Sequence, residues 1–369
     1  MEALLDMFAI VAPGFEEECR AELQALDAQE IAVERGGVSF RGDRVQLQRA
    51  NLRLRTASRV LVRVGTFRSR DFPQLFRRCR DLPWGRYVKP ATPLEVTVST
   101  RRSRLIHSGR IAATLSDAVD RALGRDGAEG PFRQRIQVRI EDDLCQVSID
   151  SSGELLHRRG YRSESGAAPL RESLAAGILL KLGWQHNEAL VDPMCGSGSF
   201  LVEAALMVRG TAPGGQREFA FMHWPKFRAG AWQALLSQQS SEHQQPLLRG
   251  GDIDSQVLLR AARNAERAGV SGMIEWAEGG LIAMKAPAES GLVICNPPYG
   301  ARLGEGEGLR QLYRDFGDLL RREFSGWRYG FLCPEPQLAG LTGLAETPLC
   351  HLSNGGLQVA LYAGRVEGK

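Results

Sequence analysis

The stretch Asp192-Pro-Met-Cys-Gly-Ser-Gly198 decides the fold, because it joins a short apolar run to a helical pattern. The run Ala189–Asp192 is typical of a buried strand, and Phe200–Val208 is typical of a covered helix. Gly196 and Gly198 allow positive φ and let the backbone approach a ligand closely. No Gly-Lys-Ser/Thr sequence follows, so the turn is not a phosphate-binding P-loop. The turn predicts an α/β domain that holds a nucleotide-like cofactor.

The alternation of strand and helix continues from about residue 169 onward. The expected strands after the first are Leu247–Ile253, Met273–Trp276, Gly291–Cys295 and Tyr329–Cys333. The expected helices are Leu170–Leu182, Ser255–Ala268 and Leu309–Phe324. Two last strands, Cys350–Leu352 and Leu357–Leu361, flank the turn dipeptide Asn354-Gly355 and predict an antiparallel edge. Strands that alternate with helices form a mostly parallel sheet, which helices cover on both faces.

A second motif, Asn296-Pro-Pro-Tyr299, follows the predicted strand Gly291–Cys295. The Asn296 amide oxygen and the Pro297 carbonyl can accept hydrogen bonds from an exocyclic NH2 group, which stabilises that group as it becomes tetrahedral and positive. Pro297 and Pro298 fix the loop and leave no N–H to compete, and Tyr299 can stack on a flipped base. Either motif alone could be an ordinary turn. Together, in this order, they predict methylation of an amino group by S-adenosylmethionine.

An acidic stretch, Gly250-Gly-Asp-Ile-Asp254, ends the strand that follows the glycine turn. A carboxylate at this place can accept two hydrogen bonds from ribose hydroxyls, as in dinucleotide-binding folds. Asp252 is the first candidate and Asp254 the second, although Asp254 could instead cap the following helix. The residues expected to bind the cofactor in these stretches are Asp192, Pro193, Cys195, Gly196, Ser197, Gly198, Asp252, Ile253 and Asp254, together with Asn296.

Two regions precede this domain. Residues 1–50 predict a small α+β piece with strands at Phe8–Val11, Ile31–Glu34 and Val38–Phe40 and a helix over Glu16–Leu26. Residues 51–155 include an alternating strand at Leu94–Thr100, a helix over His107–Leu123 and a hairpin of Ile136–Ile140 with Cys145–Ile149. Residues 156–369 then form the domain that contains both motifs.

The charge distribution is more informative than the net charge of +4. The segment Arg53–Arg80 contains nine arginines and one acid, Asp71. A basic patch of this kind suits a polyanion. It is equally consistent with a solvated surface, because the chain prefers arginine throughout.

Cysteine spacing and hydropathy exclude several classes of protein. No two of the seven cysteines lie closer than 17 residues, so no CxxC pair exists and no metal site is predicted. Cys295 is expected to pack in its strand rather than to act as a nucleophile. No apolar run approaches the ~20 residues that span a bilayer, and Met1–Ile10 lacks the shape of a signal peptide. We therefore expect a cytoplasmic protein.

These motifs resemble those of the bacterial THUMP-domain RNA methyltransferases, in particular the 23S rRNA guanine-N2 methyltransferases of the RlmL type. The stretches that carry the resemblance are Pro13–Glu17, Gly37–Gly42, His157–Arg162, Ala168–Leu174, Asp192–Phe200 and Asn296–Gly300. The resemblance implies a ferredoxin-like region (1–50), a THUMP RNA-binding domain (51–155) and a class I, Rossmann-like methyltransferase domain (156–369). It also implies S-adenosylmethionine as donor, N2-methylguanosine as product, and 23S rRNA or a large-subunit assembly particle as partner.

The resemblance assigns further residues and reveals two departures. Pro169, Leu170 and Glu172 are implied to line the methionine end of the cofactor. Family members usually carry an acid after the third strand, where this chain has Gly280 with Glu278 nearby. The second motif continues as Gly-Ala-Arg over residues 300–302, where the family often has Gly-Glu-Arg. The chain also ends without the second methyltransferase domain of fused relatives, so we expect one activity.

Three alternatives remain open from the sequence. A tRNA guanine-N2 methyltransferase would share the same architecture. A DNA adenine-N6 methyltransferase would share the Asn-Pro-Pro-Tyr motif, but it needs a sizeable region for target recognition, and only about 70 residues follow Tyr299. An RNA-binding assembly factor that has lost catalysis would be favoured by Gly280 alone.

Overall fold

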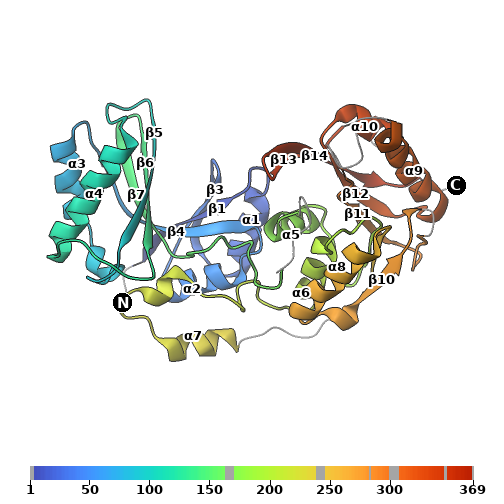
Figure 1. Ribbon diagram of the computed structural model, residues 1–369, viewed down its shortest axis with the longest axis horizontal. Helices are drawn as coiled ribbons and strands as arrows, with labels where there is room; N and C mark the ends of the chain where they lie inside the picture. Colours follow the sequence, from blue (N-terminus) through green and yellow to red (C-terminus); the bar gives the residue numbers. More distant parts are fainter. Residues whose placement is uncertain are drawn as a thin grey trace. The chain divides into compact units, whose positions relative to one another are not determined.

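Two seven-stranded sheets organise the chain (Figure 1) in a computed structural model that describes residues 4–162, 170–237, 246–281, 284–298, 307–344 and 347–367. The chain divides into two compact units, and each sheet lies in one of them. Unit 1 comprises Met1–Val11, Cys19–Leu156 and Arg217–Gln238. Unit 2 comprises Ala12–Glu18, His157–Gln216 and Gln239–Lys369. Each unit therefore contains a segment that the sequence order alone would give to the other.

The sheet of unit 1 runs through both N-terminal regions. Its strands, in spatial order, are β2 (Gln29–Glu34), β3 (Gly37–Gly42), β1 (Leu5–Val11), β4 (Ala57–Arg68), β7 (Leu144–Asp150), β6 (Gln134–Glu141) and β5 (Leu94–Arg101). All neighbours are antiparallel except β5 and β6. The long strand β4 pairs with β1 on one side and with β7 on the other, so it joins the two regions into one sheet.

Helix α1 (Glu16–Ala25) begins in unit 2 and continues into unit 1 at Cys19. The other helices of unit 1 are α2 (Arg44–Arg53), α3 (Phe72–Arg80), α4 (Ser108–Leu123) and α7 (Ala229–Leu236). Two of them begin at aspartate caps: Asp43 accepts from the Gln46 amide, and Asp71 accepts from the Gln74 amide. Such caps satisfy N–H groups that have no partner inside the helix. Helices α3 and α4 lie side by side along the outer part of the sheet (Figure 1). A single-turn helix, Trp84–Arg86, follows α3.

Residues 217–238, which the sequence order gives to the third domain, are part of unit 1. Trp224 anchors this segment: it is buried, its indole N–H donates to Gln134 Oε1 at 2.7 Å, and its ring meets Tyr87 edge-on at 5.0 Å. The Phe221 amide donates to the Ser151 carbonyl. A buried Trp whose N–H is hydrogen-bonded contributes apolar packing and also fixes the orientation of its segment. The segment is therefore a structural part of unit 1.

The sheet of unit 2 has the spatial order β10 (Ile274–Glu278), β9 (Leu248–Asp252), β8 (Ala189–Asp192), β11 (Gly291–Cys295), β12 (Arg328–Cys333), β14 (Leu357–Arg365) and β13 (Cys350–Asn354). The first five strands are parallel, and β14 and β13 are antiparallel. The predicted mostly parallel sheet with an antiparallel C-terminal edge is confirmed.

Helices cover both faces of this sheet. Helices α5 (Glu172–Lys181), α6 (Ser199–Val208) and α8 (Ser255–Arg267) lie on one face, and α9 (Glu307–Glu323) and α10 (Pro336–Leu341) lie on the other (Figure 1). Beneath α9, Phe316 and Tyr313 pack with Val293 and Phe331 of the sheet in one buried cluster. Within the described part of the chain, no helix has the length and apolarity needed to cross a bilayer.

Helix α5 begins two residues later than the sequence predicts. Its first residue is Glu172, and Arg171 precedes it in extended conformation. Leu170 lies outside the helix because its carbonyl oxygen accepts hydrogen bonds from Arg162 and from the Ser199 hydroxyl. Tertiary contacts therefore override the local helical pattern here. Pro169, which the resemblance assigns to the cofactor site, lies outside the described residues.

Phe15 fixes the short N-terminal segment of unit 2. Its side chain is 1% exposed and packs against Gly177 of α5, where an added Cβ would lie 2.9 Å from the ring. Glu18 and Lys181 pair beside it at 2.8 Å. Since only glycine leaves room for the ring, the segment and α5 are matched in shape.

We predict that Phe15→Ala destabilises the protein by about 3 to 5 kcal/mol, because it removes a fully buried ring and leaves a cavity. Chemical denaturation gives the free energy of unfolding. Val33→Ala, at a site that is 43% exposed, is the control and should change it by less than about 0.5 kcal/mol. Equal effects of the two substitutions would contradict the prediction.

Candidate functional site

Three strand ends meet at one edge of the unit 2 sheet. Strand β8 lies between β9 and β11, with Asp192 in register with Gly250 on one side and Val191 with Val293 on the other. The chain goes from β8 to β9 on one side and returns to β11 on the other, so the strand order reverses at β8. In open α/β sheets, ligands bind at the carboxyl ends of the strands at such a switch point. The glycine turn and the described residues of the second motif, Asn296–Pro298, lie there.

The glycine turn that follows β8 is held by hydrogen bonds from three directions. The Cys195 amide donates to the Gly251 carbonyl at 2.8 Å, and the Gly196 amide donates to Asp252 Oδ2 at 3.0 Å. Asn264 of α8, which is fully buried, donates to the Ser197 carbonyl at 3.1 Å. These bonds fix the backbone of the turn before any ligand binds.

Both predicted glycines of the turn have positive φ: Gly196 has 54° and Gly198 has 80°. A Cβ at Gly198 would lie 2.8 Å from the Trp276 ring, and one at Gly250 would lie 2.7 Å from the same ring. Gly198 therefore lets the turn lie directly on the indole. A Cβ at Gly196 would meet no atom of the described residues within 4 Å, which leaves open space beside the turn for a ligand.

Arg162 joins the turn to the stretch before α5. Its guanidinium donates to the Leu170 carbonyl at 2.9 Å and to the Ser199 hydroxyl, and its Nε lies 3.5 Å from Glu172. Glu172 is only 3% exposed, and burial raises the pKa of its carboxyl while Arg162 opposes that rise. Leu170 and Glu172, both predicted to bind the cofactor, are thus held together at the edge of the site.

A buried polar network lies beneath the turn. The Tyr161 hydroxyl donates to Glu203 at 3.0 Å, and Arg159 lies 3.6 Å from the same carboxylate. Arg267 donates both to the Tyr161 carbonyl and to Asn264. Buried charges persist in proteins when they are paired and hydrogen-bonded, so the network connects residues 159–162 rigidly to α6 and α8.

Asp192 is the buried carboxyl at the centre of the site. It is 2% exposed, and its Oδ1 accepts from the Met194 amide at 3.2 Å. Burial raises its pKa well above the usual value, and the nearby Asp252 carboxylate adds to the rise. A carboxyl held in this way is stabilised in its ionised form by a ligand that brings positive charge.

The acidic stretch after β9 divides two roles between its aspartates. Asp252 accepts from the Gly196 and Asp254 amides, while Asp254 accepts from the Gln256 and Val257 amides and so caps α8. Asp252 is therefore the better placed of the two to meet a ribose. Between them, Ile253 is 80% exposed at this edge. An apolar side chain so exposed is available to cover a planar ring.

Glu278 lies near Gly280, the position at which family members usually carry an acidic residue, and could take the place of that residue. It is the last residue of β10 and pairs in register with Asp252. Its side chain is exposed, so it can turn toward a ligand at this edge. A Cβ added at Gly280 would meet none of the described atoms within 4 Å, so no contact fills the place of the missing side chain.

The second motif begins one residue after β11. The Asn296 side-chain oxygen is buried and has no hydrogen-bond partner among the described residues. A buried acceptor without a donor is unfavourable, so this atom marks a place where a ligand N–H is expected. Pro297 is buried and Pro298 half-buried beside it. Tyr299, the predicted stacking residue, lies outside the described residues.

Neither cysteine of the site has the character of a nucleophile. Cys295 is fully buried beneath α9, and Cys195 is 6% exposed. Burial raises the pKa of both thiols well above the usual value, with a further rise from Asp192. A thiol of this kind is a poor nucleophile. Pro193, also buried, completes the first turn after β8.

Sequence reasoning missed the residues that support the turn. Arg162, Asn264 and Trp276 come from three different elements and contact the turn only through the fold. Arg162 and Tyr161 lie in the stretch 157–162 that carries the family resemblance, which is the one signal available for them. Nothing in the local sequence of α8 distinguishes Asn264 from any other polar helix residue.

The predicted basic patch over Arg53–Arg80 is too broad. Arg59 is bound to the buried Asp150, and Arg63 pairs with Glu34 at 2.7 Å. Arg77, Arg78 and Arg80 are exposed on the last turn of α3. Arg59 and Arg63 therefore serve the fold, whereas Arg77, Arg78 and Arg80 present positive charge to solvent.

We predict that Asp192→Asn melts at a higher temperature than the wild type near neutral pH. The pKa of Asp192 is raised in the folded state. Its stabilising contribution is therefore complete below the unfolded value of about 3.9 and is lost as pH rises through the folded pKa. Asparagine does not ionise and keeps the acceptor for Met194. The gap in melting temperature should shrink as pH falls.

Asp254→Asn is the matched control for this measurement, since asparagine caps a helix as well as aspartate. Its melting temperature should follow that of the wild type across the same pH series. A lower melting temperature for Asp192→Asn at neutral pH would mean that the carboxylate stabilises the fold.

Comparison with known proteins agrees with this geometry. An RMKL-like methyltransferase domain matches residues 159–361, which is more than half of the chain. An RlmL ferredoxin-like domain matches residues 6–61, and a THUMP domain matches residues 69–150.

Two curated relatives and one solved structure illustrate the match. A Synechocystis protein provisionally named an RNA methyltransferase is 36% identical over 96% of this chain and 95% of its own. The ribosomal RNA large subunit methyltransferase K/L of Syntrophotalea carbinolica is 37% identical over 98% of this chain, which spans only 53% of that relative.

The solved structure is that of a protein assigned as a methyltransferase, in complex with SAH (S-adenosylhomocysteine). It is 29% identical, covers 100% of this chain and 99% of its own, and superposes with a TM-score of 0.89. The chain therefore belongs to the family of methyltransferases that carry an RMKL-like methyltransferase domain with an RlmL ferredoxin-like and a THUMP domain.

Proposed function

We propose that the protein transfers a methyl group from S-adenosylmethionine to the exocyclic N2 amine of a guanosine in 23S rRNA. The use of S-adenosylmethionine and the class, an RNA methyltransferase of the RlmK/L type, follow from the family. The position on the base and the identity of the RNA are the proposal. The observation that carries it is the buried Asn296 oxygen, which has no donor among the described residues.

Asn296 solves the chemical problem of a weakly nucleophilic amine. The lone pair of an exocyclic amine on a purine is delocalised into the ring. When Asn296 Oδ1 and the Pro297 carbonyl accept its two N–H groups, charge that develops on nitrogen is stabilised and the amine is held in line with the methyl group. Because the Asn296 oxygen is already buried, it has no hydrogen bond to water to lose when the amine binds. Binding therefore gives a donor to an acceptor that was unfavourably left without one.

The residues around the glycine turn fit the cofactor. When bound, S-adenosylmethionine would supply an electrophilic methyl group, with S-adenosylhomocysteine as its leaving group. Gly196 leaves open space, Asp252 offers acceptors for ribose hydroxyls, and exposed Ile253 offers an apolar surface for the adenine. The raised pKa of Asp192 suits a ligand with a sulfonium and an amino group, since positive charge lowers that pKa.

The choice of RNA rests on the THUMP domain and on the names of the relatives. A matched THUMP domain over residues 69–150 accounts for the N-terminal region as an RNA-binding module, which disfavours the DNA adenine-N6 alternative. A relative that is named a ribosomal RNA large subunit methyltransferase supports 23S rRNA over tRNA. The non-catalytic alternative is disfavoured by the Asn296 side-chain oxygen, which is buried and has no hydrogen-bond partner among the described residues.

We predict that Asn296→Ala lowers kcat at least about a hundredfold, because it removes a preorganised acceptor that acts in the transition state. Binding of RNA, measured by filter binding, should change little. Asn187→Ala is the control, since Asn187 is exposed outside the site. Retained activity of the Asn296 variant would refute the assignment of the acceptor.

We expect N2-methylguanosine in 23S rRNA when the protein is incubated with labelled S-adenosylmethionine and separate pools of unmodified 23S rRNA, 16S rRNA, tRNA and DNA. Digestion to nucleosides and chromatography identify the product. N2-methylguanosine in the tRNA pool instead would support the proposed reaction but mean that tRNA, and not 23S rRNA, is the substrate. N6-methyladenosine in any pool would overturn the proposed base, and an unlabelled set of pools would favour the RNA-binding factor without catalysis.

A further inference from the structure

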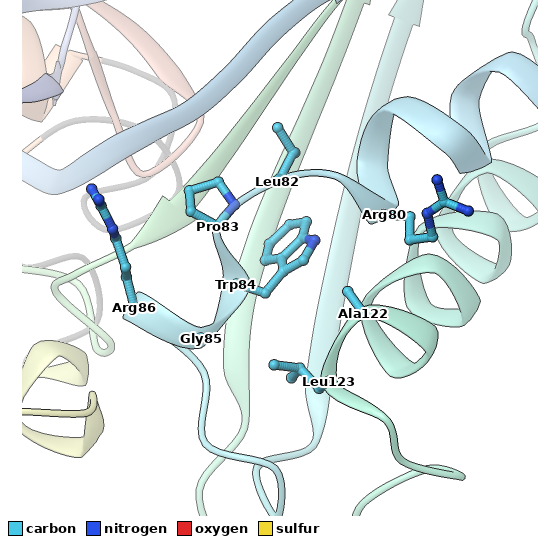
Figure 2. A pocket seen from close by; sticks show the side chains of 8 residues that line it. All are labelled: Arg80, Leu82, Pro83, Trp84, Gly85, Arg86, Ala122 and Leu123. Atoms are coloured by element: carbon cyan, nitrogen blue, oxygen red, sulfur yellow. The ribbon is translucent and has the colours of Figure 1, made fainter.

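Two adjoining hollows mark the surface of unit 1 next to the single-turn helix Trp84–Arg86. The first has a volume of about 460 Å³, with Arg80 and Arg86 on opposite sides of it (Figure 2). The second, of about 210 Å³, is lined by Arg86 together with Arg44 and Lys226. Both hollows share Gly85 and Arg86, and no acidic residue of the described chain lines either. The two hollows therefore form one surface with a single sign of charge.

Two of these cationic side chains form no ion pair with a described residue. Arg86 and Lys226 are exposed, and neither has an acidic partner among the residues that the structure describes. The charge of Arg80, by contrast, is shared with Asp81 at 2.9 Å. Unpaired surface cations next to one another repel, so a site that gathers them is suited to an anionic ligand.

Lys226 is held in a conformation that favours glycine. Its φ is 64°, in the left-handed region, where a Cβ is unfavourable. The turn around it is fixed from both sides: the buried Trp224 anchors it, and Arg44 donates to the Pro225 carbonyl at 3.1 Å. Strained residues persist where the surrounding structure fixes them, and they gather at functional positions. Glycine would fit this conformation better, but only lysine places a positive charge beside Arg44 and Arg86.

The floor of the first hollow is closed to base stacking. Trp84 is 1% exposed, and its indole N–H donates to the Cys79 carbonyl at 2.7 Å. An aromatic platform for bases needs an exposed ring. The surface therefore offers cations without a stacking partner, which is the combination that contacts phosphates and ribose rather than base edges.

We propose that this surface, formed by Arg44, Arg86 and Lys226, binds the phosphate backbone of the RNA substrate without regard to sequence. The proposal rests on the proposed function as an RNA methyltransferase. It goes beyond the THUMP domain, since Arg44 precedes residues 69–150 and Lys226 follows them. Residues 217–238, inserted between α6 and β9 of the methyltransferase domain, thus contribute to RNA affinity as part of unit 1.

The substitution Lys226→Gly tests the surface and the strain together. We expect it to raise the melting temperature, because glycine accepts φ of 64° without steric cost. We expect RNA affinity near 0.1 M salt to fall about fivefold to tenfold and the slope of log K against log salt to fall by about one. Adding Arg86→Gln should lower the slope by about one more.

Asp27→Gly is the matched control. Asp27 is also an exposed residue at positive φ, 57°, and it lines neither hollow. This variant should gain stability in the same way, yet leave the salt slope at the wild-type value. Binding is measured by filter retention of a labelled 23S rRNA transcript over a salt series, and stability by thermal unfolding.

The outcomes separate this proposal from the proposed function. A Lys226→Gly protein that binds the transcript with wild-type affinity and salt slope would overturn the surface, whatever nucleoside the enzyme methylates. A reduced slope supports the surface even if the methylated product differs from N2-methylguanosine, because binding is measured without S-adenosylmethionine. A fall in affinity with an unchanged slope would overturn it as well, since it would mean that no ionic contact was lost.

Discussion

Everything at the site depends on the position of one four-residue strand. Strand β8 lies between two parallel neighbours and beneath helices on both faces, so all four of its residues are buried. The chain must leave this crowded place within a few residues, and glycines at positive φ make that turn possible. The ends of β8, β9 and β11 place the amides of this turn, the Asp252 carboxylate and the Asn296 oxygen at one edge of the sheet. Topology, rather than any single side chain, brings these groups together.

The local parts of this arrangement could be predicted from the sequence. The strand before Asp192, the glycine turn and the helix after it follow from apolar periodicity and from the conformations that glycine allows. The loop that begins at Asn296 is predictable in the same way, because a buried strand must end at a polar turn. Each of these inferences needs only neighbours in the sequence, and each element lies within a few residues of its predicted bounds.

The rest depends on contacts between distant residues, which a single sequence does not reveal. Arg162 prevents Leu170 from joining its helix by binding its carbonyl, and Asn264 holds a carbonyl 67 positions away. Asp254 is a candidate for the cofactor by sequence, whereas in the structure its oxygen caps α8. The arginines of β4 look like part of a patch, although their partners, Asp150 and Glu34, lie on other strands. In every case the amino acid suits two roles, and the fold selects one.

The exchange of segments between the units has a consequence for synthesis of the chain on the ribosome. Domains generally fold in order as they emerge, the N-terminal one first. Unit 1 cannot follow that order, because Trp224 must be made before its bond to Gln134 can form. Phe15 emerges among the first residues, yet its partner Gly177 is translated far later. The nascent chain therefore carries the Phe15 ring uncovered until α5 has been translated.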